Sequence, residues 1–336
     1  MSQGSKREAL KDYYTSTFDV NNLRQVIDFN TFSTREFGFV SLNGKFFRNH
    51  SFEEPKELQD FMIDRCPTDA YIGAVYDEPP SRETPIHKLE WKGHELVFDI
   101  DLNDYDSVRK YVCECTGAGQ VCNRCWKLIN VSIIMIDETL RRDFGMNDIV
   151  WLFSGRRGVH AWVRDKVGFD LNRDQRQSII DYLSVVRGDD ETSRVQDRTK
   201  LKYDFRKRIE STVFEYYLKN IRRKDLIELG LSGGAASSII KQLKHQEGRV
   251  DDNLTRDFNY RLGKINKYDE ILRRWAPRID HKVSIDLRRL LRMPTSIHGK
   301  TGCVARILDP DPKIIFNFDP DNEESIFPEF QQAKKE

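Results

Sequence analysis

The run LVFDID, which begins at Leu96, restricts the fold of this chain more than any other segment. In a β-strand successive side chains point to opposite faces, so Leu96, Phe98 and Ile100 enter a core while Asp99 and Asp101 share the other face. Two like charges on one face repel and add no stability to the strand. Mg²⁺ removes this repulsion, because it is held by one or two carboxylates together with phosphate oxygens and water. The run therefore predicts a buried strand with a metal-binding edge.

An ordinary alternative is that the strand ends at Asp99 and that Asp101, Asn103 and Asp104 form a turn. Aspartates are common in turns, because their side chains hydrogen-bond to nearby backbone groups. The D-x-D pattern by itself leaves both interpretations open.

A second motif, SGRRGVH, predicts a tight basic turn between two strands. Glycines at both ends allow the backbone to bend sharply and approach a ligand. Arg156 and Arg157 supply forked donors that suit phosphate oxygens, and His160 begins the next strand as a further donor. A surface hairpin with a solvated basic tip is the alternative. The chain has no G-x-x-x-x-G-K-[ST] motif, so a P-loop is not expected.

Four of the six cysteines lie close together, at Cys113, Cys115, Cys122 and Cys125. The C-x-x-C spacing of the last pair is typical of half a zinc knuckle, and four thiolates complete a closed tetrahedral site. Disulfides and unligated thiols are the alternatives. The beginning of the chain has no apolar segment of a secretory signal, which favours a reducing compartment. The cluster therefore predicts one structural Zn²⁺ in a loop at about 111–127.

The overall charge says little about partners. The formal net charge is only +1, so a nucleic-acid partner would require a local basic patch on a balanced surface. No segment approaches the ~18 consecutive apolar residues of a membrane span, so no membrane partner is expected.

Hydrophobic periodicity predicts a mixed α/β core interrupted by a helical subdomain. The core is expected over 1–170 and again over 276–320, with the helical subdomain over 171–275 and a polar tail over 321–336. The predicted elements are a helix over 6–32, a hairpin turning at Asn43-Gly44, a helix near 53–65, strands at AYIGAVY and HELVFDIDL, a helix over 126–144, two strands in WLFSGRRGVHAWV and a strand at KIIFNF.

These motifs together resemble the small, catalytic subunit of archaeal and eukaryotic DNA primases. VFDID followed by WLFSGRRGVHAWV is similar to the two signature motifs of that family, and TREFGF, YIGAVY and RMPTSIHGKTG resemble further blocks in the same order. The resemblance spans roughly 30–165 and 275–305 and leaves the helical region unmatched. It implies the archaeo-eukaryotic primase fold, an α/β catalytic core with an inserted zinc loop and a helical subdomain.

The resemblance also implies a role for particular residues. Asp99, Asp101 and Asp280 match the catalytic carboxylates, which would hold two Mg²⁺ or Mn²⁺ ions. Glu36 and Arg48 match nucleotide-binding positions near the active site. The triphosphate of the incoming nucleotide would be held by six further polar residues, Ser154, Arg156, Arg157, His160, Arg292 and His298. The cysteine loop matches a zinc-stabilised loop of the family.

The activity that the resemblance implies is synthesis of short RNA primers from NTPs on single-stranded DNA at the start of replication. The expected partners are a large primase subunit, forming a heterodimer, and in a eukaryote the DNA polymerase alpha complex. The expected location is the nucleus, or the cytoplasm of an archaeon. A non-catalytic zinc-containing scaffold subunit and a repair polymerase of the same superfamily are the alternatives. The three carboxylates and the basic turn speak against a scaffold, and YIGAVY with the cysteine loop favours the replicative enzyme.

Overall fold

The computed structural model describes residues 2–113, 115, 121–187, 194–195, 203–245 and 250–327. It contains two compact units. The first comprises Met1–Ile100, Leu140–Asp181 and Ile279–Glu336, and the second comprises Asp101–Thr139 and Tyr182–Arg278. No helix in the described ranges is both long and apolar enough to cross a membrane.

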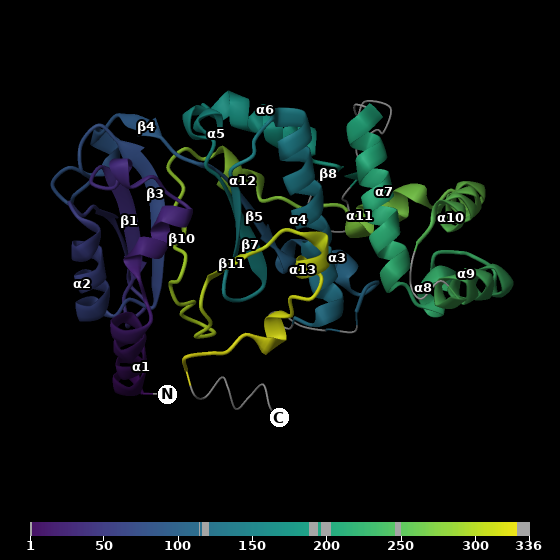
Figure 1. Cartoon of the computed structure of the whole chain (residues 1–336), viewed down its shortest axis with the longest axis horizontal. Coiled ribbons are helices and arrows are strands. Elements are labelled where there is room, and N and C mark those ends of the chain that lie inside the picture. Colours follow the sequence, from purple (N-terminus) through teal and green to yellow (C-terminus); the bar gives the residue numbers. More distant parts are fainter. Residues whose placement is uncertain are drawn as a thin grey trace. The chain divides into compact units, whose positions relative to one another are not determined.

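The first unit contains an antiparallel sheet built around the predicted hairpin (Figure 1). The strands lie in the order β10-β3-β1-β2, with β4 beside β3. Their bounds are β1 Arg35–Val40, β2 Phe46–His50, β3 Asp69–Tyr76, β4 Trp91–Gly93 and β10 Leu291–Arg292. Gly44 has φ +80°, as the predicted turn at Asn43-Gly44 requires. Helices α1 (Gln3–Ser16) and α2 (Pro55–Arg65) bury Leu10 and Met62 in the same core as Phe37 and Ile72 of this sheet.

A second antiparallel sheet of the first unit contains the two motifs identified in the sequence. Its order is β11-β6-β7-β5. The bounds are β5 Leu96–Asp101, β6 Ile149–Phe153, β7 Gly158–Val163 and β11 Arg306–Leu308. This order makes the D-x-D strand and the strand that follows the basic turn immediate neighbours. Short helices flank these strands in sequence, namely α5 Lys166–Asp170, α6 Arg173–Leu183, α12 His281–Ile285 and α13 Pro312–Ile315.

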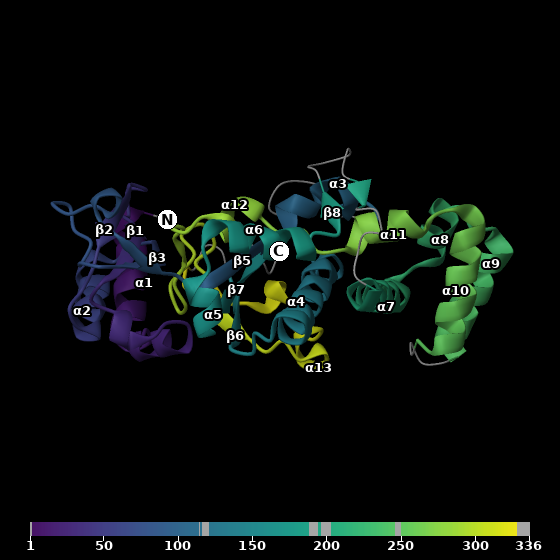
Figure 2. The ribbon, with the colours of Figure 1, turned by 90° about the horizontal axis from the view of Figure 1, so that it is seen from above.

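The second unit is mostly helical (Figure 2). Its helices are α3 Asp106–Arg109, most of α4 Asn123–Phe144, α7 Tyr203–Asn220, α8 Arg223–Glu228, α9 Gly233–His245, α10 Asp252–Ile265 and α11 Tyr268–Trp275, and a short hairpin joins β8 Val186–Arg187 to β9 Arg194–Val195. Aromatic side chains form its core: the rings of Tyr217 and Phe258 stack at 5.8 Å, and those of Phe214 and Tyr268 lie 4.5 Å apart.

The described elements confirm the mixed α/β class, the hairpin, the strand at AYIGAVY and the helix over 126–144, and they correct two other predictions. The segment 6–32 is not one helix, because Asp19 and Asp28 accept backbone N–H groups and begin separate 3₁₀ turns, Val20–Gln25 and Phe29–Thr31. KIIFNF is not a strand, because Asp311 caps a helix in which a proline occupies the first turn. Within the predicted zinc loop and tail, 114, 116–120 and 328–336 lie outside the described residues.

Candidate active site

The D-x-D strand brings Asp99 beside His160 and Asp280. Because β5 and β7 are neighbours, the Asp99 Oδ1 atom lies 3.7 Å from His160 Nε2. The backbone N–H of Asp280 donates to the Asp99 carbonyl oxygen at 3.0 Å. The side chain of Asp280 caps α12, where its Oδ1 accepts the N–H groups of Lys282 and Val283 at 2.9 and 3.3 Å. Three of the predicted site residues, distant in sequence, therefore meet in the first unit.

Asp101 lies two positions beyond Asp99 on β5. The two aspartates are the only half-buried residues of this strand, and the other four are buried. The strand continues to Asp101, so the interpretation in which it ends at Asp99 is wrong. Part of the turn interpretation is nevertheless correct, because Asp101 Oδ1 accepts the Asn103 N–H at 2.8 Å and caps a 3₁₀ turn, Leu102–Tyr105.

His160 is neutral near pH 7. Burial is the main cause that lowers its pKa to about 3, and the positive charge of Arg292 lowers it further. Its contact with Asp99 is therefore that of a neutral ring with a carboxylate, although the distance alone would suggest an ion pair. A neutral imidazole offers one N–H donor and one acceptor nitrogen.

The SGRRGVH turn packs closely against the loop that contains His298. The Ser154 N–H donates to Gly158 O at 3.0 Å and closes the turn between β6 and β7. Gly155 has φ +87°, and a Cβ atom there would lie 2.7 Å from His298 Cβ. Thr301 Oγ1 donates to Gly155 O at 2.7 Å. The glycine predicted from the turn is thus also required by the close approach of a second loop.

A cationic pocket of about 470 Å³ lies in the first unit between the β1–β2 turn and this loop. Its lining includes three residues of the predicted triphosphate set, Arg156, Arg292 and His298, together with Lys6, Lys300 and Asp69. The other three residues, Ser154, Arg157 and His160, are outside the described lining. Convergent cations of this kind suit a ligand with several phosphate groups.

Asp69 organises the cations of this pocket. Its Oδ1 accepts Arg292 Nη1 at 2.9 Å and the Gly299 N–H at 3.0 Å. Burial alone would raise the pKa of Asp69, but Arg292 and the Gly299 N–H together lower it below its usual value. Lys6 Nζ donates to the Gly299 carbonyl at 2.9 Å. Sequence reasoning missed Asp69 and Lys6, since neither belongs to a recognisable motif.

His298 is also neutral near pH 7. Burial and then Arg292 lower its pKa to about 3, against the opposing effect of Asp69. Its Nδ1 atom accepts the Lys300 N–H at 3.3 Å, which leaves the ring proton on Nε2 as a donor.

Glu36 and Arg48 bind each other. Arg48 Nε and Nη2 donate to the two carboxylate oxygens of Glu36, each at 2.7 Å, and Glu36 is fully buried. Arg48 Nη2 also donates to the Arg288 carbonyl at 3.0 Å. This pair therefore fixes the segment that leads into β10, which contains Arg292. A direct contact of either side chain with a nucleotide remains a prediction.

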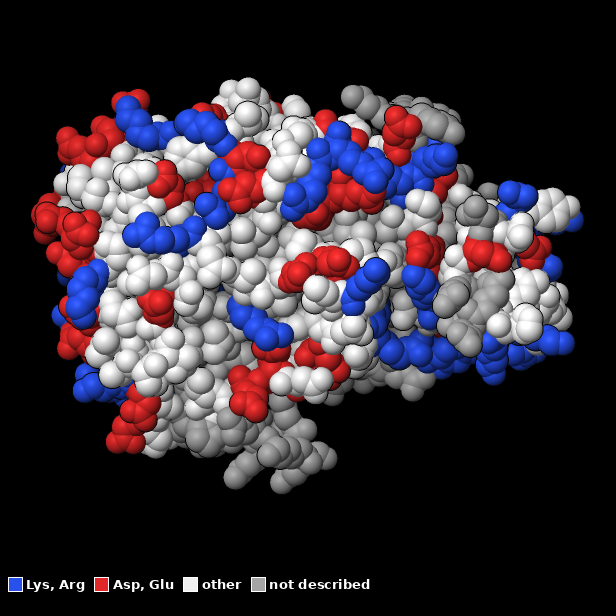
Figure 3. All heavy atoms as spheres, viewed as in Figure 1, with Lys and Arg blue, Asp and Glu red and all other residues white. Residues whose placement is uncertain are grey.

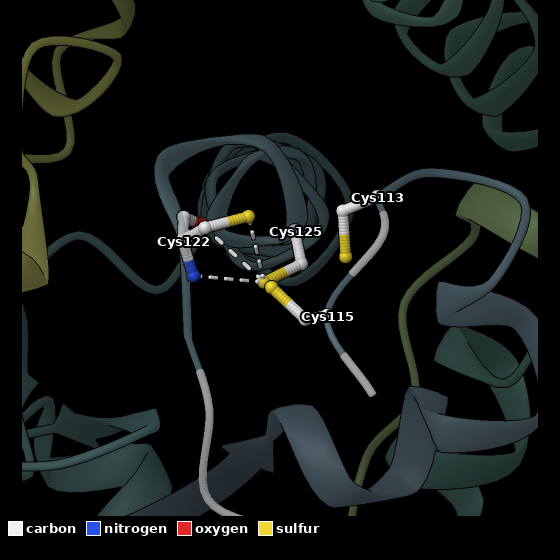
Figure 4. Close-up of side chains that lie close together, drawn as sticks. All are labelled: Cys113, Cys115, Cys122 and Cys125. Atoms are coloured by element: carbon white, nitrogen blue, oxygen red, sulfur yellow. Dashed lines mark hydrogen bonds between the residues drawn. The ribbon is translucent and has the colours of Figure 1, made fainter. Parts of the chain in front are cut away.

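The second unit contains the four-cysteine cluster (Figure 4). The sulfur atoms of Cys113, Cys115, Cys122 and Cys125 all lie within 4.8 Å of one another, and those of Cys122 and Cys125 are 3.7 Å apart. A tetrahedral zinc with Zn–S bonds of about 2.3 Å requires sulfur atoms about 3.8 Å apart, so this donor set fits the ion.

A neighbouring cation favours thiolates over thiols in this cluster. The guanidinium of Arg109 lies beside the cluster, with Nη2 3.8 Å from Cys125 Sγ. Cys113 and Cys125 are buried, as expected for a structural rather than a catalytic metal.

Charge on the face shown in Figure 3 is mixed, in agreement with the low net charge. Lys and Arg gather along one edge of the second unit, over α8 and α9. Positive charge is therefore locally concentrated.

This α/β protein thus has carboxylates at a strand edge, a cationic pocket and a cluster of four thiols, which are donor types that suit metal ions and phosphate groups. Comparison with known proteins identifies its family. The family model described as DNA primase small subunit matches residues 98–310. The chain belongs to this family, as its motifs predicted.

Relatives come from both eukaryotes and archaea. The chain is 31% identical to the DNA primase small subunit of Saccharomyces cerevisiae, over 82% of this chain and 73% of the yeast protein. It is 30% identical to that of Schizosaccharomyces pombe, over 92% of this chain and 74% of the relative. It is 29% identical to the DNA primase small subunit PriS of Pyrococcus horikoshii, over 94% of this chain and 90% of the relative.

Proposed function

We propose that this chain is the catalytic subunit of a DNA primase, which joins NTPs into short RNA primers on single-stranded DNA and so initiates replication. The observation that carries the proposal is the contact of Asp280 with Asp99, beside His160. This main-chain contact brings two of the three proposed metal-binding aspartates together in the unit whose cationic pocket suits a triphosphate, and so supports the proposal.

Asp99, Asp101 and Asp280 would hold two Mg²⁺ or Mn²⁺ ions. Bound there, such ions lower the pKa of an attacking hydroxyl and stabilise the leaving oxygen of an in-line displacement. In the proposed reaction the primer 3′-oxygen bonds to the α-phosphorus while the α–β phosphoanhydride breaks. Pyrophosphate leaves, and the hydroxyl proton passes to solvent.

The side chains of the basic turn and pocket would hold the nucleotide. Arg156 and Arg292 neutralise the triphosphate, and neutral His298 donates from Nε2. Ser154, Arg157 and His160 would complete this set from the turn and from β7. Asp69 keeps the Arg292 guanidinium fixed, so the donor geometry exists before the nucleotide arrives.

The cysteine cluster would hold one structural Zn²⁺. All four donors are sulfur, which leaves no coordination position for a reacting water molecule. Its expected contribution is to the stability of the second unit.

The small-subunit names of the relatives imply a larger partner. We propose a heterodimer with a large primase subunit, which in a eukaryote works with the DNA polymerase alpha complex in the nucleus. For an archaeal source the same heterodimer would work in the cytoplasm.

The test is primer synthesis from labelled ATP on oligo(dT) with Mg²⁺ or Mn²⁺. Asp99→Asn should reduce synthesis by at least about 100-fold, because a charge that stabilises the transition state is removed. The matched control is Asp174→Asn, at an exposed position of α6, which should retain wild-type activity.

A non-catalytic scaffold would show no synthesis even in the wild type, assayed alone and with its large subunit. A repair polymerase would extend a supplied primer with dNTPs but start none. Either result would overturn the proposal.

A further inference from the structure

A second pocket of the first unit has no role in the site described above. Its volume is about 680 Å³, and its lining combines residues from α1, the β1–β2 turn, α2 and the loop after β3. The described lining contains four cationic side chains and one carboxylate. The cations are Arg7, Lys45, Arg65 and Arg82, and the carboxylate is Asp64. A lining with this excess of positive charge attracts an anionic ligand.

The one carboxylate does not neutralise these cations. Arg65 Nε lies 3.1 Å from Asp64 Oδ2, but both side chains are about two-thirds exposed or more, at 68% and 73%. Exposed pairs of this kind contribute little energy and are readily exchanged for another anion. Arg7 Nη2 donates to the backbone carbonyl of Asp64 at 3.4 Å.

Three residues with aromatic rings, Phe47, His50 and Phe61, also line this pocket. The ring centroid of His50 lies 5.2 Å from that of Phe47 and 5.8 Å from that of Phe61. The Nε2 atom of His50 is buried without a hydrogen-bond partner in the described structure. Cations interleaved with aromatic rings are typical of sites that bind single-stranded nucleic acid, where phosphates meet the cations and bases stack on the rings. A free phosphate ion would bind to the cations alone, so the aromatic rings favour a ligand that also contains bases.

The two pockets share a wall. Ser41 and Leu42 line both, and the turn that contains them is closed by the Gly44 N–H donating to Ser41 O at 2.8 Å and the Ser41 N–H donating to Lys45 O at 3.0 Å. The second pocket is therefore adjacent to the one proposed to hold the nucleotide.

We propose that the second pocket binds the sugar–phosphate backbone of single-stranded nucleic acid through one or two consecutive phosphates, with a base against Phe47 or Phe61. This assignment rests on the proposed function, in which single-stranded DNA is the template, and it adds a binding site away from the proposed catalytic residues. The binding itself can be measured without catalysis.

The test uses the full chain in EDTA, where no synthesis occurs. Binding of a fluorescent fifteen-nucleotide oligo(dT) is measured by anisotropy over a range of NaCl concentrations. The double variant Arg65→Gln/Arg82→Gln should bind about tenfold more weakly, and the slope of log affinity against log salt should fall by about 0.7 for each phosphate that the variant leaves without a cation. The affinity for ATP, measured separately, should not change.

The matched control is Lys88→Gln/Lys313→Gln, which removes two exposed cations outside this lining. It should bind oligo(dT) within about twofold of the wild type, because neither lysine meets the strand. Circular dichroism and thermal melting confirm that both variants are folded.

If the pocket variant binds oligo(dT) as tightly as the control, the inference is wrong. If it loses ATP or tripolyphosphate binding but keeps oligo(dT), the pocket takes a free polyphosphate and the single-strand assignment is overturned. Neither result bears on the proposed primase activity, which the Asp99 variant tests separately.

Discussion

The backbone N–H of Asp280 is hydrogen-bonded to the carbonyl oxygen of Asp99 at 3.0 Å. Main-chain atoms, rather than the carboxylates, join these two segments. The position of the third carboxylate is therefore set by the fold, and a side chain can be changed at either position without removing this link.

Substitutions of Asp280 should separate its charge from its capping role. Asp280→Asn keeps a good N-cap for α12 but removes a charge, so we expect primer synthesis to fall by at least about 100-fold with the melting temperature nearly unchanged. Asp280→Ala should lose the same activity and also about 1 kcal/mol of stability. Synthesis assays and urea unfolding of both variants make the comparison. An active Asp280→Asn enzyme would contradict the proposed metal-binding role.

Removal of the thiol cluster should affect stability first. Cys122→Ser with Cys125→Ser should abolish bound zinc by elemental analysis and lower the melting temperature, with less effect on nucleotide affinity, because the cluster lies in the other unit from the cationic pocket. Cys303→Ser, outside the cluster, is the control and should retain zinc. Full stability of the double variant without zinc would refute the structural role.

Gly155 should tolerate alanine poorly. Its φ of +87° is unfavourable for an L-residue, and the new Cβ would lie 2.7 Å from His298 Cβ. We expect Gly155→Ala to cost about 2 kcal/mol or more and to weaken nucleotide binding by displacing His298. Gly145→Ala is a close control, because its φ is +68° and nothing lies within 4 Å of the added atom, so only about 1 kcal/mol should be lost. Equal costs in urea unfolding would show that the contact with His298 is unimportant.

Loss of Asp69 should leave a buried guanidinium without its carboxylate. The side chains of Arg292 and Asp69 are only 8% and 14% exposed. Asp69→Asn should therefore destabilise the fold by about 3 kcal/mol and raise the KM for NTP. Asp60→Asn breaks the exposed pair with Lys56 and should cost less than about 1 kcal/mol. An unchanged KM in the Asp69 variant would show that Arg292 does not contact the nucleotide.

Stability should fall in mild acid because of His94. Burial lowers the pKa of this ring to about 4, against the opposing effect of Glu95. Between pH 4 and the unfolded value of about 6.5 the unfolded chain binds more protons than the folded one. The stability associated with the neutral ring is complete above about pH 6.5, and about 3 kcal/mol is lost as the pH falls toward 4. Urea unfolding across this range should show a flatter pH dependence for His94→Gln, and an identical slope would exclude His94 as the cause.

The features that were predictable from the sequence are local ones. Alternation along LVFDID placed Asp99 and Asp101 correctly, and the Asn43-Gly44 turn and the cysteine spacing also depend on a few consecutive residues. The cationic pocket depends on long-range packing, in which Lys6 of the first helix meets Gly299. No pattern in the chain could reveal that contact, because an exposed helical lysine has the same sequence appearance.

Family resemblance supplied Asp280 and Arg292, which local reasoning would not have chosen. The first is an aspartate after a proline segment, and the second is one of several arginines near it. Their long-range contacts are visible only in the fold. The main-chain N–H of Asp280 donates to Asp99, and the guanidinium of Arg292 donates to Asp69.

The clamp of Asp69 on both Arg292 and the Gly299 N–H has a thermodynamic consequence. An arginine on an open surface gives up rotational freedom when it engages an anion, at a cost of about 0.5–1.5 kcal/mol. In this protein the Arg292 side chain is already ordered by folding, because its guanidinium donates to the Asp69 carboxylate and to the Ile297 carbonyl. An incoming anion therefore meets an immobilised donor and keeps more of the attraction as net affinity.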